Sequence, residues 1–128
     1  ITDLVENIAE SSLWGIPWLF MAFALLVAPL EELYYRGFLY RALQNIIGTT
    51  ASAVIVILWF SGIHGVQLAG SIPAIGIIMI MGAICTYMRI RHDSVVPSIV
   101  CHFSYNATLM VISIGGVLIQ NVMASAVQ

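Results

Sequence analysis

Two carboxylates and a guanidinium follow a long uncharged run near the start of the chain. Glu31, Glu32 and Arg36 come directly after about twenty residues without a charge, 11–30. At helical spacing Glu32 and Arg36 are i and i+4 with the acid first, which is the better orientation for an ion pair. The Glu31 side chain points about 100° away from that of Glu32 around the same helix. We therefore expect Arg36 to neutralise Glu32 and the Glu31 carboxylate to remain for chemistry.

Two histidines lie inside other apolar segments, each with a polar or aromatic residue one helical turn away. Phe60 precedes His64, and Asn106 follows His102. Polar and ionisable residues at membrane depth are rare and usually face the interior of the helix bundle. Heights estimated from the helical rise allow these residues and Glu31 to converge at a middle depth. We expect Glu31, His64, His102 and Asn106 to surround one cavity.

A carboxylate and imidazoles that converge in a partly dry cavity can activate water. The carboxylate takes a proton, an imidazole orients or shares it, and other donors hold the developing oxyanion. Two histidines and a carboxylate are also a workable set of ligands for zinc or another divalent metal, here Glu31, His64 and His102. The H-E-x-x-H signature of classical zinc proteases is absent. The sequence leaves both chemistries open.

Structural interpretations stand beside the catalytic ones. The favoured interpretation of Glu32 and Arg36 is a structural ion pair rather than a direct participant in chemistry. A membrane histidine such as His64 can also be a hydrogen-bonded core residue. Phe60 is typical of a packing wall, and His92, which lies in a polar stretch, is expected to be solvated.

The composition indicates an integral membrane protein. The chain is 61% hydrophobic and 8% charged, whereas soluble domains are about 25% charged. The net charge of −2 decides nothing about nucleic acid, but the sequence has no basic patch, so no nucleic-acid partner is expected. The length suits one domain, 1–128, with about four spanning helices. Because the chain starts at Ile1 rather than Met, we expect a fragment of a longer protein. Cys85 and Cys101 lie in apolar runs and are expected to pack as thiols.

The first half of the pattern predicts an interfacial segment and one interrupted helix. Residues 1–12 are polar and acidic, and 13–29 are continuously apolar. Pro29 is expected to kink or divide this helix, because proline lacks an amide hydrogen and crowds the preceding turn. The helix then resumes over 31–47 and stops at Gly48, a typical residue after a helix end.

The second half predicts three more spans. They cover 51–64, 72–88 and 95–114, with a loop or re-entrant segment at 65–71 and a polar connection at 89–94.

A glycine pair is expected to end the last of these spans. Gly115 and Gly116 break the pattern, and 117–128 form a weak C-terminal helix. The fold class is thus all-α, a polytopic transmembrane helix bundle. The positive-inside rule makes the side that carries the arginines cytoplasmic: Arg36, Arg41, Arg89 and Arg91.

The three polar sets together resemble the CPBP intramembrane protease family, also called the CAAX protease or Abi family. Its pattern is E-E-x-x-x-R, then F-x-x-x-H, then H-x-x-x-N. The chain carries these motifs in order at 31–36, 60–64 and 102–106, on separate predicted helices. The resemblance covers roughly residues 20–115, and type II CAAX prenyl endopeptidases are among the family's members.

The resemblance implies roles for the motif residues. Glu31 is similar to the family's general base, with His64 positioning the attacking water, and His102 and Asn106 resemble its oxyanion-stabilising groups. The second acid and the arginine of the first motif take a structural role. The family is commonly classed as metallopeptidase, although a metal-free glutamate mechanism is also argued.

The resemblance also implies a substrate and a place in the cell. The substrate would be a membrane peptide or a lipidated protein, as in CAAX processing, or one of bacteriocin or self-immunity processing. Membrane lipid is the other partner, and a bacterial plasma membrane is favoured over the endoplasmic reticulum. The alternative is a non-catalytic immunity or scaffold protein, or a transporter component that uses Glu31 and the histidines as a proton relay. The internal inverted repeats that favour a transporter are not found.

Overall fold

The structure is a computed structural model that describes residues 25–67 and 71–126. It divides into two compact units. One unit is Ala28–His102, and the other joins Ile1–Val27 to Phe103–Gln128. The predicted interfacial segment and most of the first predicted span lie outside the described residues.

The motif-bearing segment is one helical stretch with a change of winding. Residues 25–32 are α-helical, η1 is a π-helix at Leu33–Leu39, and α3 is Tyr40–Ile47. Helix continues through Pro29, so the predicted division there is wrong. The helix changes instead to the wider π-helical winding at Leu33, four residues after Pro29. At the end of this π-helix the Tyr40 N–H donates to the Tyr35 carbonyl, five residues back. Such π segments occur often at functional sites.

Gly48 ends this stretch, as the sequence predicts. Its φ of 82° and ψ of 171° lie in a region that is essentially reserved for glycine. α4 follows at once as Thr49–Gln67. It is longer than predicted, since residues 65–67 continue the helix rather than opening a loop. The remaining part of that predicted loop, 68–70, lies outside the described residues.

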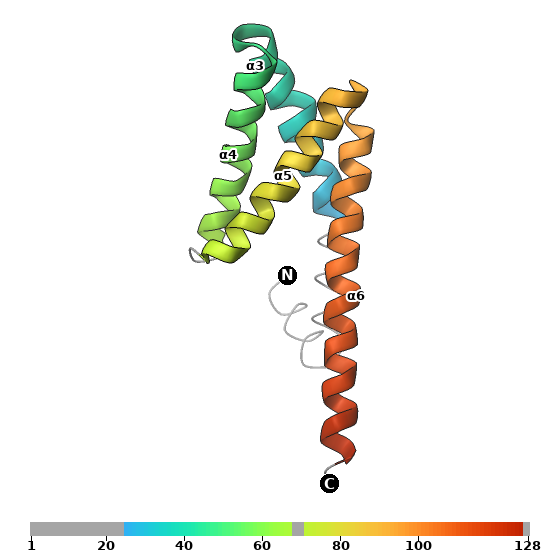
Figure 1. Cartoon of the computed structure of the whole chain (residues 1–128). Helices are drawn as coiled ribbons and strands as arrows, with labels where there is room; N and C mark the ends of the chain where they lie inside the picture. The colour runs from blue at the N-terminus through green and yellow to red at the C-terminus, as the bar shows by residue number, and fades with distance from the viewer. Residues whose placement is uncertain (1–24, 68–70, 127–128) are drawn as a thin grey trace, which may run out of the picture. The chain divides into compact units, whose positions relative to one another are not determined.

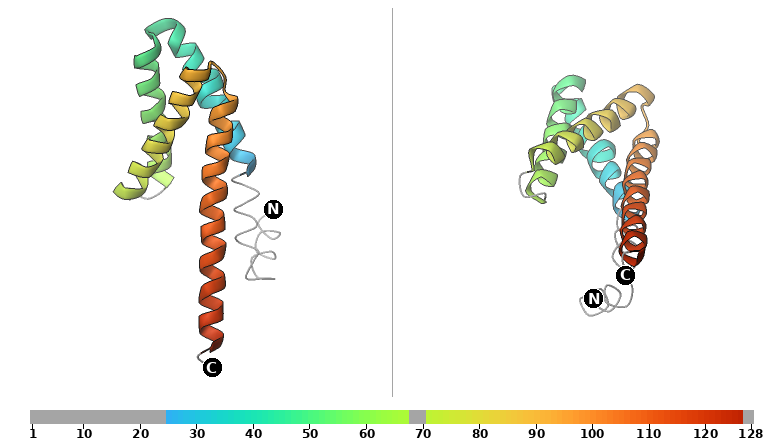
Figure 2. Two further views of the ribbon diagram at one scale, coloured as in Figure 1. Left: turned by 45° about the vertical axis from the view of Figure 1, so that its right-hand side comes forward. Right: turned by 60° about the horizontal axis from the view of Figure 1, so that its bottom comes forward.

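α5 is Ile72–His92, with Pro73 in its first turn as the pattern indicates. α4 and α5 pack along each other (Figures 1 and 2). The predicted polar connection at 89–94 is mostly helical, which corrects the sequence interpretation. Arg89 explains the difference, because it donates to the Arg36 carbonyl at 3.2 Å and to Asp93 at 2.9 Å. The turn is confined to 93–95, with Asp93 left-handed at φ 45°.

α6 is Val96–Ala126 and is uninterrupted. The predicted break at Gly115 and Gly116 is therefore wrong, and the predicted weak C-terminal helix is the end of α6. Glycine is common in membrane helices, where leaving the helix would strand backbone polar groups in an apolar solvent.

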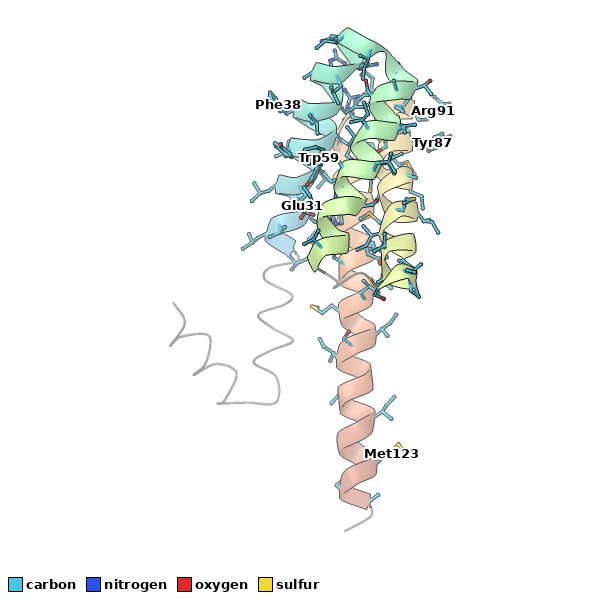
Figure 3. The ribbon with its side chains drawn as sticks, turned by 90° about the vertical axis from the view of Figure 1, so that its left-hand side faces the viewer. Glu31, Phe38, Trp59, Tyr87, Arg91 and Met123 are labelled. Carbon is cyan, nitrogen blue, oxygen red and sulfur yellow. The ribbon has the colours of Figure 1, made fainter. Side chains whose placement is uncertain are left out.

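The described residues contain three helices that are long and apolar enough to cross a membrane: Thr49–Val66, Ile72–His92 and Val96–Gly116. Large apolar side chains point outward from the unit Ala28–His102, among them Phe38, Trp59 and Tyr87 (Figure 3). Its fully buried side chains include charged and polar ones, notably Glu32 and Arg36. An apolar outside and a polar inside are typical of a membrane helix bundle. The all-α membrane fold is thus as predicted.

Candidate active site

A buried ion pair anchors the site inside the unit Ala28–His102. Arg36 Nη1 lies 2.9 Å from Glu32 Oε1, and both side chains are 0% exposed. The pairing is the one that the i,i+4 spacing predicts. Burying either charge alone would be costly, so each side chain requires the other.

His102 lies between this ion pair and Glu31. Its Nδ1 lies 2.9 Å from the same oxygen of Glu32 that Arg36 contacts. Glu32 Oε2, by contrast, has no hydrogen-bond partner within the described part of the chain. Glu32 Oε1 thus joins α6 to the motif helix across 70 positions of sequence. A carboxylate that contacts one ring nitrogen fixes the orientation of the whole imidazole.

The Glu31 carboxylate faces both imidazoles. Its Oε1 lies 3.6 Å from His64 Nε2, and its Oε2 lies 3.8 Å from His102 Nε2. The Glu31 side chain is 24% exposed and that of His64 is 19% exposed. Figure 3 shows Glu31 on the segment that leads into η1. The convergence predicted for Glu31, His64 and His102 is therefore found, and its more exposed side is formed by Glu31 and His64.

The hydrogen bonds assign the protons of the two rings. His64 Nδ1 lies 2.9 Å from the Phe60 carbonyl, which can only accept, so Nδ1 carries a hydrogen. His102 Nδ1 lies 2.9 Å from Glu32 Oε1, which also accepts from Arg36 Nη1, so we assign the hydrogen of this ring to Nδ1. In a neutral ring the remaining Nε2 is then a lone-pair acceptor. When both rings are neutral, both Nε2 atoms and the Glu31 oxygens can accept hydrogen bonds from a group held between them.

Phe60 forms the wall that the sequence predicts. It is fully buried, its ring centroid lies 4.3 Å from that of His64, and it meets the His102 ring edge-on at 5.9 Å. The Arg36 guanidinium stacks over the same ring at 4.6 Å from the centroid. One aromatic ring therefore contacts three polar side chains, limits their rotation and keeps water from their inner side.

α5 supplies two contacts that the sequence interpretation missed. Arg36 Nη2 donates to the Gly82 carbonyl at 2.8 Å, and Arg36 Nε donates to Thr86 Oγ1 at 3.3 Å. Both residues lie in a predicted span without charges. The available signal was their spacing, since small residues four apart on a membrane helix allow a neighbouring helix to approach closely.

Asn106, the fourth residue predicted for catalysis, belongs to the other unit, the one that contains Phe103–Gln128. Its catalytic role stays a prediction. His92, the last residue of α5, is exposed. Cys85 and Cys101 are both free thiols, as expected.

The three predicted metal ligands lie close together in the site. Glu31, His64 and His102 have suitable donor atoms, and both Nδ1 contacts resemble those that orient metal-bound histidines. Among the described residues, however, no group of three or more His, Cys, Asp or Glu side chains is arranged to hold a metal ion.

The comparisons with known proteins identify the family. The family described as type II CAAX prenyl endopeptidase Rce1-like has a model that matches residues 13–108, which contain all three motifs. The chain belongs to this family, and it is an integral membrane protein of a protease class. No curated protein and no solved structure gives a match.

Proposed function

We propose that the protein is an intramembrane endopeptidase in which Glu31 and His64 activate a water molecule to cleave a peptide bond. One observation carries this proposal. The Glu31 carboxylate lies within 4 Å of two imidazole Nε2 atoms, and both rings have their other nitrogen engaged elsewhere. A water molecule placed there can donate one hydrogen to the carboxylate and the other to an imidazole, and this orients its lone pair outward.

The first step forms one bond and moves one proton. The water oxygen attacks the carbonyl carbon of the scissile peptide while Glu31 takes a proton from that water. The carbonyl π electrons move to oxygen and give a tetrahedral oxyanion. In the second step the C–N bond breaks, the oxyanion re-forms a carbonyl, and Glu31 returns its proton to the leaving nitrogen. Glu31 ends as it began, as a base requires.

His102 stabilises the oxyanion only with a second proton. Its Nδ1 hydrogen points to Glu32, so donation from Nε2 requires the imidazolium form. We assign to Asn106 the role of second oxyanion donor, because its motif resembles that of the family.

The proposed substrate is a lipidated protein with a CAAX-type C-terminus. The support is the family, together with the apolar surface of the unit Ala28–His102, which suits a substrate delivered within the membrane. Processing of a bacteriocin or self-immunity peptide is the runner-up, in a bacterial plasma membrane.

A test of metal dependence belongs with this proposal. Metal analysis of the purified full-length protein should be paired with cleavage assays with and without a chelator. Activity that survives chelation in a metal-free preparation supports a glutamate–histidine mechanism. Activity lost with the metal, and restored by zinc alone, supports the metallopeptidase assignment with Glu31, His64 and His102 as ligands.

The decisive variant is Glu31→Gln in the full-length protein. It keeps the shape of the side chain but removes the proton acceptor, so cleavage of a lipidated CAAX peptide should fall by several orders of magnitude, with normal membrane insertion. Asp93→Asn is the matched control, because it makes the same carboxylate-to-amide change at an 80% exposed side chain. It should cleave at the wild-type rate.

The opposite result distinguishes the enzyme from a scaffold. A scaffold tolerates Glu31→Gln, since an uncharged amide is cheaper to bury than a carboxylate. Wild-type cleavage by Glu31→Gln would remove Glu31 from the mechanism and with it the proposal.

A further inference from the structure

α5 contacts the candidate site although none of the three motifs lies on it. Thr86 Oγ1 accepts a hydrogen bond from Arg36 Nε at 3.3 Å and donates its own hydrogen to the Gly82 carbonyl at 2.8 Å. That same carbonyl accepts from Arg36 Nη2 at 2.8 Å. Thr86 is 1% exposed, so water does not compete for these bonds. Two edges of the guanidinium are thus held by one turn of α5.

Gly82 also allows the close approach that these bonds need. A Cβ at this position would lie 3.2 Å from Phe60 Cδ1 and 3.4 Å from Arg36 Nη2. Phe60 and Arg36 are both fully buried. A methyl group at position 82 would require the Phe60 ring or the Arg36 guanidinium to shift by a few tenths of an ångström.

The contacts continue in one line toward the reacting groups. The third edge of Arg36, Nη1, holds Glu32 Oε1, and that oxygen holds His102 Nδ1. The opposite ring nitrogen of His102 faces Glu31. A displacement of the guanidinium therefore tilts Glu32 and turns the imidazole that lies beside Glu31. Catalytic sites are sensitive to shifts of about 1 Å in such groups.

We propose that Gly82 and Thr86 are positioning residues, which fix Arg36 and, through Glu32, set the orientation of the His102 imidazole. The inference rests on the proposed endopeptidase function and adds α5 to its machinery. Neither residue touches the reacting atoms. Their predicted signature is a lower kcat with an unchanged KM, because binding of the peptide does not involve Arg36.

The test compares three threonine variants of the full-length protein in a lipidated-peptide cleavage assay. Thr86→Val keeps the volume and leaves the Arg36 Nε hydrogen without an acceptor. It should lower kcat about 10-fold, near the lower end of what a hydrogen bond to a charged group is worth. Thr86→Ser restores the hydroxyl and should recover most of the wild-type rate.

Thr108→Val is the matched control. Thr108 Oγ1 also donates to the carbonyl four residues back, that of Ser104, at 2.8 Å, but on an exposed part of α6. Its kcat should equal that of the wild type. Gly82→Ala provides a second perturbation from the same turn of α5, and it should lower kcat in the same way.

A second background separates positioning from general destabilisation. Arg36→Lys keeps the positive charge but lacks the Nε hydrogen that Thr86 accepts. In that background Thr86→Val should have almost no further effect on kcat per folded molecule. An equal 10-fold loss in both backgrounds would show that Thr86 does not act through Arg36, and would overturn the inference.

The two proposals fail in different ways. A wild-type protein that cleaves no lipidated peptide contradicts the proposed function. A wild-type protein that cleaves, together with a Thr86→Val variant of unchanged kcat, contradicts only the positioning role.

Discussion

Replacing Arg36 by methionine would leave a carboxylate buried without its cation. The guanidinium contacts Glu32 at 2.9 Å, the Gly82 carbonyl at 2.8 Å and the Phe60 ring at 4.6 Å. Among the described residues, Glu32 would retain only the hydrogen bond from His102, on a side chain that is 0% exposed. Breaking one partner of a buried pair in this way costs about 3–5 kcal/mol. We expect Arg36→Met to lower the free energy of unfolding by about 4 kcal/mol.

Removing both charges should be cheaper than removing one. In the double variant Glu32→Gln with Arg36→Met, no charge is stranded, and the main remaining loss is the hydrogen bond from the guanidinium to the Gly82 carbonyl, which still accepts from Thr86 Oγ1. A hydrogen bond from a charged group is worth about 1.5–3 kcal/mol. The double variant should therefore lose about 2 kcal/mol, less than Arg36→Met alone. Glu32→Gln alone strands the guanidinium in part and should lose about 3 kcal/mol.

The assay is reversible unfolding of the four full-length proteins in mixed detergent micelles, followed by helix content. The two single losses sum to about 7 kcal/mol, so the predicted double-mutant coupling is about 5 kcal/mol. A double variant whose loss equals the sum of the single losses would mean that Glu32 and Arg36 act independently. It would refute the interpretation of the pair as a mutually dependent buried unit.

Three further predictions test other parts of the chain. Asn106→Ala should lower kcat about 10²–10³-fold, the usual loss for one oxyanion donor; an unchanged kcat in a peptide-cleavage assay would exclude that role. Gly48→Ala should cost about 1–3 kcal/mol in detergent unfolding because of its backbone angles, whereas Gly62→Ala, in the interior of α4 with open space around its Cβ, should be neutral or stabilising. The hydrogen bond from Arg89, followed by the charge of Arg41, holds the pKa of Asp93 below its usual range. Because the pKa of Asp93 is lower in the folded than in the unfolded state, its ionised carboxylate stabilises the fold. This stabilisation is fully present above the unfolded-state pKa of about 3.9 and is lost as the pH falls through the folded-state pKa. Asp93→Asn should thus lower the Tm near neutral pH, with a difference from wild type that disappears in strong acid.

Local spacing predicted those parts of the site that lie on one helix. The Glu32–Arg36 pair follows from an i,i+4 separation, and Phe60 and His64 contact each other for the same reason. The stop at Gly48 follows from a backbone conformation that glycine adopts most easily. The membrane class follows from composition, because 8% charged residues cannot cover a soluble domain. These features need no knowledge of which helices are neighbours.

Rules learned from soluble helices gave the errors in element boundaries. Pro29 was expected to kink or divide its helix, and Gly115 and Gly116 to break theirs, yet helix runs through all three positions. In an apolar solvent a broken helix exposes backbone groups that nothing satisfies, so continuity outweighs local preference. The polar residues at the end of α5 are helical because Arg89 donates hydrogen bonds to the Arg36 carbonyl on η1 and to the Asp93 carboxylate.

Only the tertiary structure decided which faces of different helices meet. The sequence placed Glu31, His64 and His102 at similar depths, but the rotation of each helix about its own axis determined that Glu31 contacts both imidazoles. The same rotation placed Gly82 and Thr86 against the guanidinium of Arg36. Depth follows from counting residues along one helix. Rotation depends on how small and large side chains interlock between helices, which no single segment of sequence contains.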